Sequence, residues 1–119
     1  MGTRSTVRFY ENGKLILSVY QQYDGYISGV GCELANFLKD KKIINGISDQ
    51  KMADGYANGM GCLAAQYVAS QKTEIGGFYL TSADDMEEYN YEVRLTDGKI
   101  IIKVDDFSGT PEELLQFKE

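Results

Sequence analysis

The chain has 119 residues, a formal net charge of −6 and no histidine. Its length is typical of a single domain, 1–119, and no apolar run reaches the ~18 residues that a membrane-spanning helix needs. The negative charge argues against direct binding of duplex nucleic acid through its phosphates. The lack of histidine excludes Ser-His-Asp and Cys-His catalysis, and with only two cysteines we predict no metal site and no cofactor.

The N-terminal segment predicts a β-hairpin. Residues 3–10 and 15–23 are rich in β-branched and aromatic residues, and Asn12-Gly13 between them is a strong two-residue turn signal. In that register Glu11 lies opposite Lys14, which is a favourable cross-strand pair.

A first helix is expected from about 28–31 to Lys42. Lys39, Lys41 and Lys42 then fall in its last turn, where positive charge suits the helix dipole. Its apolar stripe, at helical spacings of three and four residues, consists of Val30, Leu34, Phe37 and Leu38.

A second helix is expected from a cap at Ser48 or Asp49 to about Gln71. The glycines at positions 55, 59 and 61 weaken it, because glycine in a helix interior costs up to ~1 kcal/mol relative to alanine. Two interpretations stay open. We expect a helix that is continuous or kinked through these glycines, and the alternative is a break near Asn58-Gly59.

The C-terminal half predicts a second hairpin and a short helix. Residues 89–96 and 99–104 flank Asp97-Gly98, and their pairing gives one apolar and one polar face. A short strand at 78–80 precedes this hairpin, and a helix at 110–117 follows it. The fold class is therefore α+β: a two-layer sandwich with an about five-stranded antiparallel sheet, two main helices on one face and a short C-terminal helix.

The chain also contains a near-repeat. Residues 24–32 recur as residues 54–62, and both copies read Asp-Gly-Tyr-x-x-Gly-x-Gly-Cys. The first copy follows a predicted strand and the second lies in or just before a helix, so a true duplication is not expected. We interpret the copies as similar solutions to one packing problem, in which small residues let the two helices approach closely.

The first copy carries a candidate ligand site at the junction between strand and helix. Tyrosines, amides and a carboxylate there can stack on a planar ring and bond its edge, and open N–H groups at Gly29 and Gly31 can hold a phosphate. Arg4 on the neighbouring strand is a candidate anion clamp. The alternative is a tight turn with tyrosines at the edge of the core. The predicted ligand-binding residues are Arg4, Gln22, Tyr23, Asp24, Tyr26 and Asn58.

A second candidate is an acidic segment before the second hairpin. It is either a solvated loop or a docking edge for a basic partner protein. The predicted partner-binding residues are Asp84, Asp85, Glu87 and Glu88.

Several motifs resemble those of a widespread group of short phage and prophage proteins. The likeness extends from residue 1 to about 104 and implies a viral origin and a small accessory role, without assigning a mechanism or catalytic residues. The motifs are Met-Gly-Thr-Arg-Ser-Thr at the start and the segments 20–26, 29–38, 57–66, 77–80 and 88–91.

Together these features predict a non-enzymatic phage accessory protein for host manipulation or counter-defence, located in the cytoplasm of the host cell. The first hypothesis is that it binds and sequesters a small nucleotide-like ligand, such as an immune signal. The alternative is an acidic inhibitor of a CRISPR effector or another host defence protein that binds nucleic acid. The third hypothesis is a hydrolase that uses carboxylates alone. A homo-oligomer is compatible with all three hypotheses.

Overall fold

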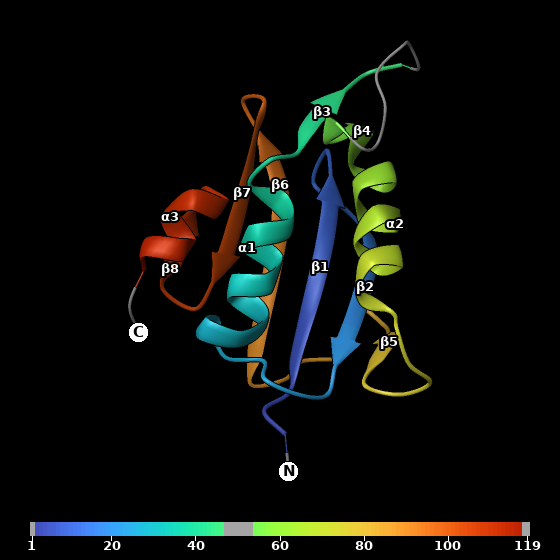
Figure 1. Cartoon of the computed structure of the whole chain (residues 1–119), viewed down its shortest axis with the longest axis vertical. Coiled ribbons are helices and arrows are strands. Elements are labelled where there is room, and N and C mark those ends of the chain that lie inside the picture. Colours follow the sequence, from blue (N-terminus) through green and yellow to red (C-terminus); the bar gives the residue numbers. More distant parts are fainter. Residues whose placement is uncertain (1, 47–53, 118–119) are drawn as a thin grey trace.

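The structure is a computed structural model that describes residues 2–46 and 54–117. In that part of the chain a six-stranded sheet, in the order β5-β2-β1-β6-β7-β8, carries three α-helices on one face (Figure 1). The strands of this sheet are β1 (Ser5–Glu11), β2 (Lys14–Gln21), β5 (Phe78–Leu80), β6 (Tyr89–Thr96), β7 (Lys99–Val104) and β8 (Phe107–Gly109). The helices are α1 (Cys32–Leu38), α2 (Gly59–Gln71) and α3 (Pro111–Gln116).

Both predicted hairpins are confirmed. Asn12 and Gly13 have φ angles of 52° and 80°, and Asp97-Gly98 has 52° and 78°. Two consecutive left-handed residues are what a type I′ turn requires, and this turn matches the twist of the strands it joins. Glu11 pairs with Lys14 at the end of the first hairpin, as predicted.

The sheet is mixed, which corrects the prediction of about five antiparallel strands. β1 pairs with β6 in parallel, with Val7 opposite Tyr91. The other ladders of the described sheet are antiparallel. Turn chemistry reveals the hairpins, but the β1–β6 pairing joins distant segments and has no local signal.

The core lies between the sheet and the helices. Val7 and Phe9 of β1 face the helices and are fully buried. Tyr67 of α2 lies among aromatic rings, with its ring centroid 5.5 Å from that of Phe9 and 5.3 Å from that of Phe37. The predicted stripe of the first helix is buried at Val30, Leu34 and Leu38.

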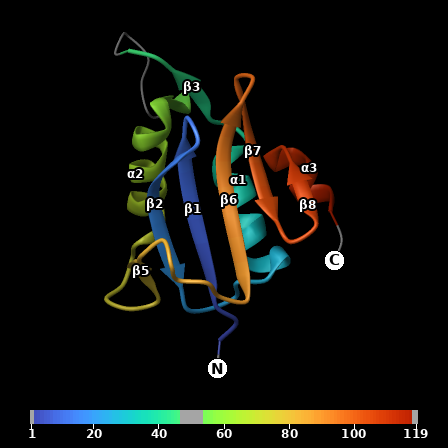
Figure 2. The same ribbon diagram turned by 180° about the vertical axis from the view of Figure 1, so that it is seen from behind.

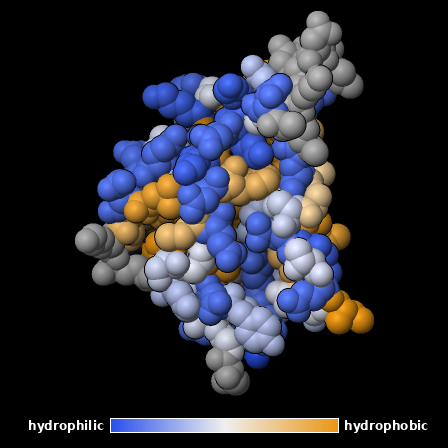
Figure 3. Space-filling view, in the orientation of Figure 1, coloured by the Kyte–Doolittle hydropathy of each residue, from blue (hydrophilic) through white to orange (hydrophobic). Residues whose placement is uncertain are grey.

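The outer surface on the helix side is mainly hydrophilic, with apolar residues visible around α3 and between α1 and α2 (Figure 3). The opposite face of the sheet carries no helix in the described residues and is seen in Figure 2. Among the helices that are described, none combines the length and apolar character needed to cross a membrane.

The second helix begins later than expected. Gly55 has φ 90°, Tyr56–Asn58 forms β4 in parallel with β3 (Lys42–Ile44), and α2 starts only at Gly59, which has φ 83°. The expected continuous or kinked helix is therefore wrong, because two glycines in the left-handed region interrupt helical geometry. The caps expected at 48–49 lie outside the described residues.

The two copies of the near-repeat do not pack two helices together. The first copy forms a π-helical turn, Ile27–Gly31, before α1, whereas the second enters α2 through β4. The small residues Gly61, Ala65 and Ala69 of α2 are exposed. α1 and α2 lie on either side of β1 in projection onto the sheet (Figure 1). The predicted close approach through small residues is therefore wrong, and α1 meets α2 through the large rings of Phe37 and Tyr67 instead.

The C-terminal helix is confirmed together with its cap. The Thr110 hydroxyl accepts a hydrogen bond from the Glu113 N–H at 3.2 Å, and the Glu113 carboxylate accepts one from the Thr110 N–H at 2.8 Å. This capping box satisfies two backbone donors that the helix itself cannot use.

We predict opposite effects of alanine at two glycines of the repeat. A Cβ atom at Gly29 would lie 2.2 Å from the Asp24 carbonyl oxygen, whereas a Cβ at Gly61 would meet nothing within 4 Å. Gly29→Ala should lower the free energy of unfolding by about 1–3 kcal/mol, as overpacking does. Gly61→Ala should raise it by about 0.5–1 kcal/mol. Urea denaturation of both variants measures the two free energies of unfolding. Equal changes in the two variants would contradict the difference in free space around Gly29 and Gly61.

Candidate functional site

The junction between β2 and α1 is built around the N-terminal residues of the chain. The Gln22 N–H donates to the Gly77 carbonyl at 2.9 Å, and the Gly25 N–H donates to the Thr3 carbonyl at 2.9 Å. A Cβ at Gly25 would lie 2.9 Å from the carbonyl carbon of Arg4, so only glycine permits this approach. The structure therefore places Arg4 beside the junction, as the hairpin register predicted.

The N–H groups of Gly29 and Gly31, which were expected to be open at this junction, are used within the turn itself. The Gly29 N–H donates to the Tyr26 carbonyl at 2.9 Å, and the Val30 N–H donates to the Asp24 carbonyl at 2.7 Å. The Gly31 N–H also points to the Tyr26 carbonyl, at 3.4 Å. An anion would have to displace these hydrogen bonds.

The predicted side chains of the junction form separate pairs. The Tyr26 hydroxyl donates to the Asp24 carboxylate at 3.1 Å, and this hydrogen bond raises the pKa of Tyr26. The Gln22 side-chain oxygen accepts a hydrogen bond from the Tyr20 hydroxyl at 2.7 Å. Tyr23 remains 62% exposed and turns toward a pocket at the end of α2.

This pocket has a volume of about 370 Å³ and a polar lining. Of the predicted ligand-binding residues, Tyr23 lines it and the other five do not appear among its described walls. Gln21 at its edge is buried, and its amide donates to the Tyr67 hydroxyl at 2.7 Å. The lining residues are Gln21, Tyr23, Glu33, Ser70, Gln71, Thr73, Glu74, Gly76, Gly77 and Phe78.

The structure does not bring Asn58 together with the junction. Asn58 lies at the start of α2, where its side-chain oxygen accepts a hydrogen bond from the Gly46 N–H at 2.8 Å. Tyr23 lies near the other end of α2, whose 13 residues span about 20 Å at 1.5 Å per residue. The two copies of the repeat therefore do not form one site.

The acidic segment is a folded connection. Residues 81–88, which we call the acidic loop, lead from β5 at one edge across β2 and β1 to β6 (Figure 2). Arg8 of β1 points to this face and is only 5% exposed. Its guanidinium donates to the Ala83 carbonyl at 3.2 Å and also to the Asp85 carbonyl.

Asn90, at the start of β6, holds the other end of the acidic loop. Its side-chain oxygen accepts hydrogen bonds from the Glu87 N–H at 3.0 Å and from the Thr6 hydroxyl at 2.7 Å. Its amide nitrogen donates to the Glu87 carbonyl at 2.8 Å. The loop is thus fixed to β1 and β6 at both ends. Sequence reasoning missed both residues. The loop partners of Arg8 lie far away in the chain, whereas Asn90 binds Glu87 only three residues away and its side chain was not singled out.

The carboxylates of the acidic loop interact with one another. A hydrogen bond between Asp85 and Glu87 lowers the pKa of Asp85 and raises that of Glu87, and the Thr81 hydroxyl also lowers the pKa of Asp85. The positive charge of Arg4 opposes the rise in the pKa of Glu87. Met86 between them is 65% exposed. The loop therefore presents an apolar side chain surrounded by carboxylates.

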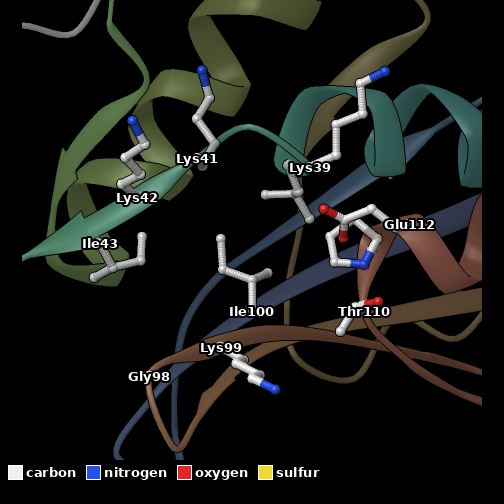
Figure 4. A pocket seen from close by; sticks show the side chains of 11 residues that line it. Lys39, Lys41, Lys42, Ile43, Gly98, Lys99, Ile100, Thr110 and Glu112 are labelled. Atoms are coloured by element: carbon white, nitrogen blue, oxygen red, sulfur yellow. The ribbon is translucent and has the colours of Figure 1, made fainter.

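A second surface, which the sequence analysis did not identify, carries the opposite charge. It is a pocket of about 470 Å³ between the end of α1, β3, the β6–β7 turn and the start of α3, and we call it the lysine pocket (Figure 4). Its apolar walls are Leu38, Ile43, Ile100 and Pro111, and its lysines are Lys39, Lys41, Lys42 and Lys99.

Three of these lysines were expected in the last turn of the first helix. α1 ends at Leu38, so Lys39 is its C-cap, while Lys41 and Lys42 lie beyond the helix. The prediction that Lys41 and Lys42 lie in the last turn of the helix, at the negative end of its dipole, is therefore wrong. In the sequence, the lysines that precede Ile43 and Ile44 were the available signal for this pocket. Lys99 could not be added to them from the sequence, because it lies in a distant hairpin.

Among the described residues, no group of three or more Asp, Glu, Cys or His side chains lies close enough together to hold a metal ion. Cys32 and Cys62 are free and half-buried. The described residues thus form the acidic loop, the lysine pocket and the polar pocket at the end of α2, and a further polar pocket of about 230 Å³ lies beside the β1–β2 turn. Comparison of the chain with protein-family models, with curated proteins and with solved structures finds no match.

Proposed function

We propose that this chain is a non-enzymatic phage accessory protein whose acidic loop docks on a basic surface of a host defence protein that binds nucleic acid. A CRISPR effector is one such target. The observation that carries the proposal is the burial of Arg8 beneath the loop. A buried guanidinium is costly unless its donors are bonded, and two carbonyls of the loop supply those bonds.

The consequence of this anchoring is a preformed acidic surface. A solvated loop would have to be ordered on binding, at a cost of about 0.5–1.5 kcal/mol for each immobilised side chain. Here Arg8 and Asn90 fix the backbone, so the outward carboxylates and Met86 are already in place. An array of carboxylates around an apolar side chain suits a protein surface that otherwise binds phosphates.

A second candidate is the capture of a small nucleotide-like ligand in the pocket at the end of α2. The exposed ring of Tyr23 at its wall favours it, since a planar base can stack on such a ring. The pocket also contains Glu33 and Glu74, and these carboxylates oppose a phosphate. This candidate therefore has less support than the acidic loop.

Neutralising the acidic loop should weaken inhibition of a basic target. In the variant Asp84→Asn/Asp85→Asn/Glu87→Gln/Glu88→Gln, we expect affinity to fall by roughly fourfold to 1,000-fold, because each of the four lost ion pairs contributes about 0.2–1 kcal/mol. The measurement is the mobility shift of target DNA by each of a panel of purified CRISPR effectors, with and without this protein.

The matched control removes the same number of charges elsewhere. Asp97, Asp105, Asp106 and Glu112 are all exposed and lie outside the loop. Their Asn and Gln replacements should leave inhibition unchanged. If both variants lose inhibition equally, the effect depends on the net charge of the chain and not on the acidic loop. If the wild type inhibits none of the effectors, the proposed target is wrong.

The interaction within the loop should appear in a pH titration. Asp85→Asn removes the carboxylate that raises the pKa of Glu87, so the pKa of Glu87 should fall toward its ordinary value. In the wild type, the loop gains negative charge as the pH rises through the raised pKa of Glu87, and binding to a basic partner should strengthen over that interval. Carboxyl carbon NMR measures both titrations, and an unchanged pKa in the variant would contradict the shared hydrogen bond.

Ligand capture is tested by calorimetry against cyclic and ADP-ribose-type nucleotides. If the second candidate holds, Tyr23→Ala should weaken binding by about 1–3 kcal/mol, the usual contribution of a base stacked on an aromatic ring. Asn58→Ala should have no effect, because Asn58 lies at the opposite end of α2. Absence of heat with every nucleotide would remove this candidate and leave the acidic loop unaffected.

A further inference from the structure

The lysine pocket has a charge opposite to that of the whole chain. Four lysines line it, and Glu112 is the only acidic residue among its described lining residues, on a chain of net charge −6. Leu38 and Ile100, which form part of its apolar wall, are almost fully buried. The pocket therefore suits an occupant that combines negative charge with an apolar group.

The arrangement of the lysines distinguishes between occupants. Figure 4 shows the side chains of Lys39, Lys41, Lys42 and Lys99 spread around the mouth, with their nitrogens directed outward and apart. The ammonium group of Lys41 lies 4.5 Å from the centroid of the Phe37 ring, and that of Lys42 lies 5.1 Å from the centroid of the Tyr56 ring. Charges that do not converge suit several separated carboxylates better than a single phosphate.

The chain itself contains a segment with this chemistry. In the acidic loop, Met86 stands between two acidic residues on each side and is 65% exposed. Methionine is unbranched and polarisable, so it fills irregular apolar cavities well. The loop is fixed by hydrogen bonds at both ends, so its shape is available before any contact is made.

One molecule cannot fill its own pocket. The acidic loop joins Arg8 and Asn90 on the face of the sheet without helices and enters β6 at its start. The lysine pocket lies on the helix side, beside the turn that ends β6. The 8 residues of β6 separate these ends by about 25 Å at 3.3 Å per residue.

We propose that the acidic loop of one copy docks into the lysine pocket of a second copy, with Met86 against the apolar wall and its flanking carboxylates facing the lysines. Because the two contacting surfaces are different, the contact is heterologous: the copy that contributes its loop keeps a free pocket, and the copy that contributes its pocket keeps a free loop. Such contacts give head-to-tail chains or closed rings. The same loop would then be covered in the assembly, so self-association and docking on a basic target compete.

The test is sedimentation velocity of the full chain over a range of concentrations at low salt. The wild type should show a sedimentation coefficient that rises with concentration. Lys39→Gln/Lys99→Gln in the pocket and Met86→Ser/Glu88→Lys in the loop should each weaken self-association at least tenfold. Lys14→Gln/Lys103→Gln, which removes two exposed lysines outside the pocket, should behave as the wild type.

Mixing the two defective variants gives the sharpest readout. The pocket variant retains an intact loop and the loop variant retains an intact pocket, so together they should form a dimer that grows no further. A wild type that is monomeric at every concentration, or a mixture that does not complement, overturns the proposal. An acidic segment of another protein would then be the remaining occupant. The pocket variant should still inhibit a basic target, so the outcome is independent of the proposed function.

Discussion

The parallel pairing of β1 with β6 is the constraint on which the rest of the structure depends. It places the N-terminal hairpin and the C-terminal hairpin in one sheet, with Val7 opposite Tyr91 at its centre. Because β5 pairs with β2 on the far side, the chain between β5 and β6 must cross two strands. The helices cover one face, so the crossing runs over the other.

This crossing explains why a charged residue is buried in the central strand. Arg8 alternates with Val7 and Phe9, so it faces away from the helices. The crossing segment covers it and accepts its hydrogen bonds, which offsets the cost of removing a guanidinium from water. The same interaction fixes the carboxylates of the segment on the surface. The strand order, the burial of Arg8 and the position of the exposed carboxylates therefore all follow from the path of this crossing segment.

Two local clusters of opposite charge lie in different parts of the molecule. Four of the 18 acidic residues of the chain lie together on the crossing segment, while four lysines surround an apolar pocket beside α3. The net charge of −6 does not show that charges of opposite sign are clustered in separate places. This clustering matters because local fields at short range, within a Debye length of about 8 Å at physiological salt, decide which surfaces meet. The tyrosine-rich junction, in contrast, uses most of its donors internally and offers little to an anion.

What the sequence by itself determined about this protein is its local structure. Asn12-Gly13 and Asp97-Gly98 specify their hairpins because few residues adopt the left-handed geometry of those turns. Thr110 specifies α3 through its cap. The acidic segment and the apolar stripe of α1 follow from composition and periodicity. Each of these signals acts over a few residues.

Only the tertiary structure decided how these elements meet. The parallel β1–β6 ladder, the separation of Asn58 from Tyr23 and the union of Lys99 with Lys39 all join segments far apart in the chain. Left-handed glycines at 55 and 59 delay the start of α2 to Gly59, where the sequence pattern predicted a continuous or kinked helix. Long-range pairing depends on how all the apolar faces are buried together, and no single segment encodes that outcome.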